Sequence, residues 1–223
     1  MTTIYKIGSR GDGVKMLQQA LCRAGYPMIC DGIYGTVTRD AVVDFQRKHG
    51  LVSDGIVGPA TIALLLPTVF RLKKSKRKIK EIIIHCTDTP EGRDYTVEQI
   101  RADHKRQGWS DIGYHYVIYR NGHIENGRDV DLIGAHCQKG GHNTYSIGVA
   151  YVGGCENKPG VPYEKQTRKD TRTLAQKAAL MKIIEDLHQL YPDAKVYNHH
   201  DFDPGKQCPC FDARTEYALV IHK

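Results

Sequence analysis

The chain has 223 residues, of which 40% are hydrophobic and 26% charged, as is usual for a globular protein. This length allows one large domain or two smaller ones, and the absence of any apolar run of membrane-span length excludes an integral membrane helix. The net charge of +7 comes from a single segment, because residues 71–80 hold seven basic residues and no acidic one.

The cysteine count and the N-terminus indicate where the chain is made. Seven cysteines is an odd number, and a chain of this length does not need disulfides in order to fold. Residues 1–10 lack the apolar core of a signal peptide. We therefore expect synthesis in a reducing cytoplasm with mostly free thiols. Cys22 and Cys30 could pair, but nothing in the sequence requires it.

The N-terminal segment contains an internal repeat. The motif D-G-I-x-G-x-x-T occurs at residues 31–38 and again at residues 54–61. Its paired glycines are typical of tight turns with positive φ. Apolar periodicity and end signals predict three short helices around one small core. These helices are expected at residues 12–24, 36–49 and 59–66.

In the second of these helices, Thr36 is a possible N-cap, and Val37, Val42 and Phe45 are expected to face the core.

Residues 1–67 are predicted to form a compact three-helix domain. This segment resembles the three-helix type of peptidoglycan-binding domain, which implies that it binds peptidoglycan. The resemblance rests on Gly11-Asp12, Val14, Leu17-Gln18, the two repeats, Ala41-Val42, Phe45-Gln46 and Gly50-Leu51.

A basic linker is predicted at residues 68–80. The favoured interpretation of its charge is a solvated connection, with contact to nucleic acid or to an acidic cell envelope as alternatives. Strands and helices then alternate through residues 81–223, which predicts an α/β domain with a mixed central sheet flanked by helices. The expected elements are strand 81–86, helix 96–107, strand 114–119, a hairpin turn at 121–122 with a return strand at 123–125, strand 146–152, helix 167–190, strand 194–197 and helix 212–222.

Polar side chains concentrate between Asn198 and Cys210, directly after a short buried strand. This stretch holds two imidazoles, two carboxylates, one ammonium and two thiols. Imidazole and thiolate together suit zinc. His85 ends one internal strand, and His199 and Cys208 follow another. If those strands are neighbours, three ligands converge at one sheet edge and leave a fourth tetrahedral position for water, as in catalytic zinc sites.

Residues 81–215 resemble the zinc-dependent N-acetylmuramoyl-L-alanine amidases of the phage-lysozyme and peptidoglycan-recognition-protein family. The matching stretches are residues 83–89, 108–116, 122–128, 134–136, Asn143, 146–149, 199–201 and 208–209. The resemblance implies zinc on His85, His199 and Cys208. The resemblance implies His199 rather than His200 as the ligand, because His199 occupies the first position of the family's H-x-D/E step; two adjacent strand-like residues cannot both face the metal.

The same resemblance implies catalytic roles for Tyr114 and Lys206 and substrate contacts for His136 and Asn143. A lysine near the metal can donate to a developing oxyanion, and a tyrosine hydroxyl can hold water or a carbonyl or relay a proton. Without the resemblance, plainer roles would be favoured for the first two: a sheet aromatic and a solvated surface charge. A loop histidine and a turn asparagine are equally compatible with the second pair.

Several positions depart from the family pattern or lack an assigned contact. Ala150 and Val152 stand on a strand where some relatives carry a catalytic glutamate, so the proton transfers fall to other groups. Gly205 looks like an insertion just before the expected catalytic lysine. Cys210 is expected to be a free thiol, and Trp109 is expected in the core.

These expectations combine into a two-domain cell-wall hydrolase. It would cut the amide between N-acetylmuramic acid and L-alanine by a zinc-activated water, as a phage or prophage endolysin made without a signal peptide and acting on the wall after release. One alternative is a protein that recognises muramyl peptides without cutting them, although Cys208 favours activity. The other is a zinc peptidase acting within the stem peptide. Peptidoglycan is the expected partner, and nucleic acid is not.

Overall fold

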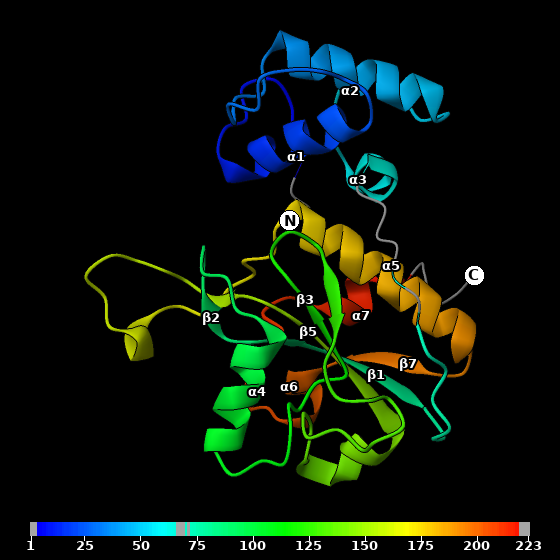
Figure 1. The fold of residues 1–223 in the computed structure, drawn as a ribbon, viewed down its shortest axis with the longest axis vertical. Coiled ribbons are helices and arrows are strands. Elements are labelled where there is room, and N and C mark those ends of the chain that lie inside the picture. The colour runs from blue at the N-terminus through cyan, green and yellow to red at the C-terminus, as the bar shows by residue number, and fades with distance from the viewer. Residues whose placement is uncertain (1–3, 66–69, 71, 219–223) are drawn as a thin grey trace.

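The computed structural model describes residues 4–65, 70 and 72–218, and it consists of a small helical unit above a larger α/β unit (Figure 1). Within these ranges no helix is long and apolar enough to cross a membrane. The small unit contains α1 (Asp12–Arg23), α2 (Thr36–Lys48) and α3 (Pro59–Leu65). The larger unit contains β1 (Glu81–Cys86), β2 (Thr89–Pro90), α4 (Val97–Arg106), β3 (Tyr116–Ile118), β4 (Ile124–Asn126), the 3₁₀ helix η1 (Lys139–Tyr145), β5 (Ser146–Tyr151), β6 (Gly154–Cys155), the 3₁₀ helix η2 (Tyr163–Lys165), α5 (Leu174–Leu190), β7 (Lys195–Asn198), α6 (His199–Phe202) and α7 (Ala213–Glu216).

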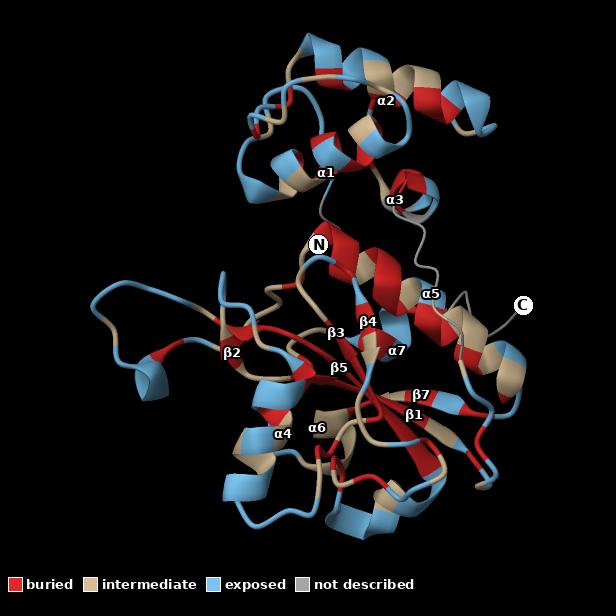
Figure 2. Ribbon diagram, viewed as in Figure 1, coloured by how far each residue is buried: buried red, intermediate tan, exposed pale blue. Residues whose placement is uncertain are grey.

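The central sheet has the strand order β4-β3-β5-β1-β7, with β4 antiparallel and the other strands parallel. Alternate side chains of a strand point to opposite faces, so each face needs its own cover. α5 covers one face, where its apolar residues pack with Ile82, Ile84 and Val149. α4 covers the other face and packs with Val117 and Val152. The predicted mixed sheet flanked by helices is confirmed, and its strands are the most deeply buried part of the unit (Figure 2).

A buried glutamine joins the first repeat loop of the small unit to its helices. The Gln18 side chain is 2% exposed. Its Nε2 lies 2.9 Å from Asp31 Oδ1, 3.1 Å from the Ile33 carbonyl oxygen and 3.2 Å from Thr38 Oγ1. Its Oε1 accepts a 2.8 Å hydrogen bond from the Gly32 amide. One side chain thus bonds the Asp, Gly, Ile and Thr positions of the D-G-I-x-G-x-x-T motif, which gives a physical reason for that motif.

The second repeat loop is held by an equivalent glutamine, Gln46 on α2. Its Nε2 lies 3.0 Å from Asp54 Oδ1, 2.9 Å from the Ile56 carbonyl oxygen and 3.1 Å from Thr61 Oγ1. Its Oε1 accepts a 2.9 Å bond from the Gly55 amide. The sequence repeat is therefore a repeat of one hydrogen-bond arrangement, in which a helix supplies the amide and the following turn supplies its partners.

Two details predicted for α2 are wrong. Val37 is 64% exposed rather than buried. The N-cap position is Gly35, with no side-chain capping bond, and Thr36 is the first helical residue. Thr38 is the inward-facing residue of this turn because its hydroxyl meets Gln18 in the core. Thr38 shares the buried face with Val42 and Phe45 at helical spacing, and Val37 lies off that face.

The basic linker is not simply solvated. Ser75 and Ile79 are buried, and Arg77 between them donates to the carbonyl oxygens of Val130 and Ser146 at 2.7 and 3.1 Å. The intervening lysines are exposed. The segment therefore packs one edge against the larger unit, which corrects the expectation of a free connection.

Two helix ends also differ from prediction. The expected helix at 167–190 begins only at Leu174, because Thr173 and Gln176 form a capping box that starts it there. The residues before it are extended, and Arg168 among them bonds Asp88. The expected helix at 212–222 is the single turn α7, and residues 219–223 lie outside the described ranges.

We predict that the two buried glutamines are strong determinants of the stability of the small unit. Replacing either Gln18 or Gln46 with leucine roughly keeps the volume but removes the acceptor of a buried glycine amide, Gly32 or Gly55, and the donor shared by the carboxylate, carbonyl and hydroxyl of the same turn. The local free energy of unfolding should fall by about 2–3 kcal/mol. Native-state hydrogen exchange of the α1 and α2 amides in the full chain measures this change.

The matched control is Gln19→Leu, because Gln19 is exposed on the same helix. It should change the local unfolding free energy by less than about 0.5 kcal/mol. Equal losses in the exposed and buried variants would contradict the assigned role of the glutamine contacts.

Candidate metal centre

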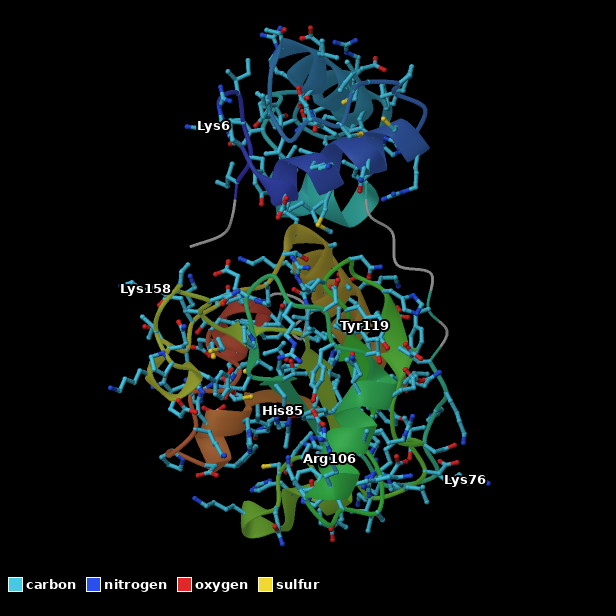
Figure 3. All side chains as sticks on the ribbon, turned by 60° about the vertical axis from the view of Figure 1, so that its left-hand side comes forward. Lys6, Lys76, His85, Arg106, Tyr119 and Lys158 are labelled. Atoms are coloured by element: carbon cyan, nitrogen blue, oxygen red, sulfur yellow. The ribbon has the colours of Figure 1, made fainter. Side chains whose placement is uncertain are left out.

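The metal-ligand candidates meet where two neighbouring strands end. β1 and β7 pair in parallel with Glu81 opposite Lys195 and Ile84 opposite Asn198. Parallel strands end at the same edge of a sheet, so the residues that follow these pairs lie close together. The expected adjacency of these two strands is confirmed. His85 lies in the centre of the larger unit, as Figure 3 shows, and is only 1% exposed.

A capping box turns the chain immediately after β7. The Asn198 side chain caps the first turn of α6, and the Asp201 carboxylate accepts a 2.8 Å bond from the Asn198 amide. Asn198 also accepts from the Ala213 amide at 2.8 Å, which ties this turn to α7. The histidines that follow are therefore helical, which corrects the expectation that they are strand-like.

The two adjacent histidines have different roles in the structure. His199 projects toward His85, with ring centroids 4.5 Å apart. The His200 amide donates to the Cys208 carbonyl oxygen at 3.0 Å, and its Nδ1 lies 3.1 Å from the same oxygen. His200 therefore holds the backbone of the third candidate ligand. Sequence reasoning missed this role because it depends on how the loop folds back.

The donor atoms of His85, His199 and Cys208 all lie within 4.8 Å of one another. Cys208 Sγ is 3.7 Å from His85 Nδ1. Zinc bonds of about 2.0–2.1 Å to nitrogen and 2.3 Å to sulfur in a tetrahedral arrangement separate the two atoms by about 3.6 Å. Two imidazoles and one thiol at this spacing fit a zinc ion with one open position.

Burial keeps the three donors uncharged when no cation is present. It lowers the pKa of His85 and His199 and raises the pKa of the Cys208 thiol well above its ordinary value. A thiolate in this setting needs a positive partner, and a divalent cation provides one. The Cys86 amide, 3.1 Å from Cys208 Sγ, adds a donor toward the sulfur.

Neither of the two expected substrate contacts is among the residues that line the cleft over His199 and Cys208. His136 is 6% exposed and sits beneath His85, with its Nδ1 3.0 Å from His85 Nε2. Asn143 Oδ1 accepts from the backbone amides of His136 and Cys137 at 2.9 and 2.8 Å. The structure therefore places His136 behind the site rather than in a groove, and Asn143 organises the loop that carries it.

A cleft of about 510 Å³ opens over two of the candidate ligands, His199 and Cys208, and brings the two expected catalytic residues into one space. Tyr114 and Lys206 line it together with His199 and Cys208. The Tyr114 ring centroid is 5.2 Å from that of His85. Burial raises the pKa of the Tyr114 hydroxyl, so this group stays protonated and can donate a hydrogen bond.

The far rim of the cleft contains features that sequence reasoning did not identify. Asp88, just after β1, forms an ion pair with Arg168 at 2.8 Å and accepts from the Tyr163 hydroxyl at 2.8 Å. These contacts hold η2 and the loop after it at the mouth. Only the unusual length of that loop could have signalled its position.

Trp109 is 38% exposed, so the expectation that it lies in the core is wrong. Its ring packs on His104 with centroids 4.4 Å apart. It also lines a separate hollow of about 310 Å³ together with Arg128 and Asn143. The indole therefore has one packed face and one open face, which a sequence cannot distinguish from full burial.

Known protein families match both units of the chain. Residues 75–211 match the N-acetylmuramoyl-L-alanine amidase family, and residues 10–65 match a peptidoglycan binding domain family. An endolysin of Enterobacteria phage K11 is 39% identical over 137 residues, which cover 61% of this chain and 84% of that protein. An endolysin of Escherichia phage T7 is 37% identical over 142 residues, which cover 63% of this chain and 87% of that protein.

Solved structures share the fold. The endolysin of bacteriophage Ph2119 from Thermus scotoductus superimposes with a TM-score of 0.50 at 24% identity, covering 70% of this chain and 92% of that one. The endolysin amidase LysCS from Clostridium intestinale gives a TM-score of 0.50 at 23% identity, covering 70% and 95%. The chain belongs to the N-acetylmuramoyl-L-alanine amidase family, and it is a peptidoglycan hydrolase of that type with an N-terminal peptidoglycan-binding domain.

Proposed function

We propose that a zinc ion held by His85, His199 and Cys208 serves the amidase reaction of this chain. The observation that carries the proposal is the convergence of two imidazoles and one thiol, within 4.8 Å of one another, at the base of an open cleft. His85 at the end of β1 lies beneath, and His199 of α6 and Cys208 of the following loop line the cleft. The donor set and its open side are those of a catalytic rather than a structural zinc site.

Hydrolysis adds water across the amide bond between the lactyl group of N-acetylmuramic acid and L-alanine. The carbonyl carbon takes the oxygen, and the alanine nitrogen leaves with a proton. A bound zinc ion supplies Lewis-acid polarisation and lowers the pKa of a bound water to about 7. The protein residues must then place the carbonyl, stabilise the developing oxyanion and pass the proton to the amine.

Tyr114 and Lys206 are the residues that we assign to these steps. The protonated Tyr114 hydroxyl donates a hydrogen bond into the cleft, to the carbonyl or to the attacking water. The Lys206 ammonium, on the loop between α6 and Cys208, donates to the oxyanion as negative charge develops on it. Both groups are donors, which suits a reaction whose transition state gains charge on oxygen.

The peptidoglycan-binding domain is proposed to hold the catalytic unit on the cell wall. Tethering raises the local concentration of the substrate without adding chemistry. The relatives named above are phage endolysins, and we infer the same role for this chain: degradation of the bacterial wall. Peptidoglycan is then both the polymer that the N-terminal domain binds and the substrate that the catalytic unit cuts.

We predict that Cys208→Ser abolishes both zinc binding and wall hydrolysis. Serine supplies no thiolate, so the metal loses its only anionic ligand. Metal analysis of the purified variant should find less than one tenth of the zinc bound by the parent protein. Release of new L-alanine N-termini from purified peptidoglycan should fall by at least about a thousandfold.

Cys210→Ser is the matched control, because this thiol lies in the same loop and is not among the converging donors. It should retain one zinc ion per chain. Full zinc content in the Cys208 variant, or loss of zinc only in the Cys210 variant, would reject the ligand assignment.

Removing the assigned donors should slow the chemistry without removing the metal. We expect Tyr114→Phe and Lys206→Met each to lower kcat by about 10²–10³-fold, since each deletes a hydrogen bond that strengthens in the transition state. Zinc content should stay at the parent level. Lys158→Met is the control, because Lys158 is an exposed lysine on a distant loop (Figure 3). An unchanged kcat in either cleft variant would remove that residue from the mechanism.

A further inference from the structure

We propose that His136 is a positioning residue for the metal site. It accepts the Nε2–H of His85 and so leaves the lone pair of His85 Nδ1 directed at Cys208 and the open cleft. The inference rests on the proposed zinc site and adds a residue to it. It also replaces the expectation that His136 contacts the substrate.

The geometry around His85 allows two proton arrangements. Its Nε2 is 3.0 Å from His136 Nδ1, and its Nδ1 is 3.7 Å from Cys208 Sγ. If His136 donates, the proton of neutral His85 lies on Nδ1 and blocks the atom that faces the sulfur. If His136 accepts, the His85 proton lies on Nε2 and Nδ1 is free to bind a cation. Only the second arrangement makes His85 a ligand.

A further hydrogen bond is consistent with this second arrangement. His136 Nε2 lies 3.2 Å from Ser146 Oγ at the start of β5. When Nε2 carries the proton of neutral His136, it donates to this hydroxyl and Nδ1 is left as the acceptor. The hydroxyl can accept or donate, so the direction of the chain is set at its other end, where a cation on His85 Nδ1 requires the His85 proton on Nε2.

The surrounding backbone is shaped to fit the His136 ring. A Cβ built on Gly148 of β5 would lie 2.5 Å from His136 Cγ, and one on Gly134 would lie 2.5 Å from His136 Cδ2. Two glycines therefore leave room for the imidazole from opposite segments. The backbone amide of His136 donates to Asn143 Oδ1, which fixes the backbone at this residue. The position of the ring is determined by contacts outside the cleft.

The position of His136 also separates this role from substrate binding. The ring is 6% exposed, and it is not among the residues that line the cleft over the ligands. A residue that acted on the substrate would alter KM directly. A residue that acts through His85 alters metal affinity first, and activity only as the metal is lost.

The test compares His136→Asn with His136→Leu in the full chain. The Oδ1 of asparagine can occupy roughly the place of the histidine Nδ1 and accept from His85, whereas leucine cannot. We expect the leucine variant to bind zinc about 10–100-fold more weakly than the parent in a chelator competition, and the asparagine variant to stay within about threefold. Ser146→Ala should give a smaller loss, because it removes the hydrogen-bond partner of His136 Nε2 without removing the ring.

Two further measurements keep the test decisive. Unfolding of the metal-free variants reports any purely structural damage, and the cobalt-substituted proteins report ligand geometry by their visible absorption. Equal zinc affinity in parent and leucine variant, or equal loss in the leucine and asparagine variants, would overturn the inference. Absence of zinc binding in the parent protein would instead reject the proposed metal site, so the two failures are distinguishable.

Discussion

The parallel pairing of β1 between β5 and β7 is the constraint on which the site depends. It brings the ends of two strands, far apart in sequence, to one edge of the sheet, and His85 and His199 lie there as a consequence. Apolar burial holds the register, since Ile82, Ile83 and Ile84 of β1 are fully buried. A slip of one residue would turn His85 to the opposite face. Core packing therefore positions two of the three candidate donors, His85 and His199. Placing these two requires no flexible loop to become ordered, in contrast to Cys208.

Buried polar groups show the same logic in both units. In the small unit, Gln18 and Gln46 each satisfy a turn that would otherwise leave several backbone groups without partners. In the larger unit, His136 is the hydrogen-bond partner of the buried His85 Nε2, and Ser146 is in turn the partner of His136. An unsatisfied polar group in such places costs more than a typical hydrogen bond contributes. These contacts thus specify one arrangement, of the repeat loops in one case and of a candidate ligand in the other.

The sequence was sufficient for much of the fold and for the convergence of the ligands. Strand β1 is a continuous apolar run, and the capping box at Thr96 has a local signal, so both could be predicted. The roles of His136 and His200 could not, because each depends on a partner more than five residues away whose backbone position only the folded chain defines. Val37 is wrongly expected in the core because it is apolar, whereas helical spacing from Val42 and Phe45 puts the polar Thr38 on the buried face, where it bonds Gln18.

The lack of a carboxylate on β5 affects the net charge of the proposed metal site. Ala150 is the register partner of His85, so a glutamate there would stand beside the ligand on the same face of the sheet. A divalent ion on two neutral imidazoles and one thiolate keeps one net positive charge, which a neighbouring carboxylate would cancel. In the proposed mechanism, alanine at this position leaves that charge available to the developing oxyanion, together with the donors Tyr114 and Lys206. On this proposal, the thiolate ligand and the missing carboxylate are two parts of one electrostatic arrangement.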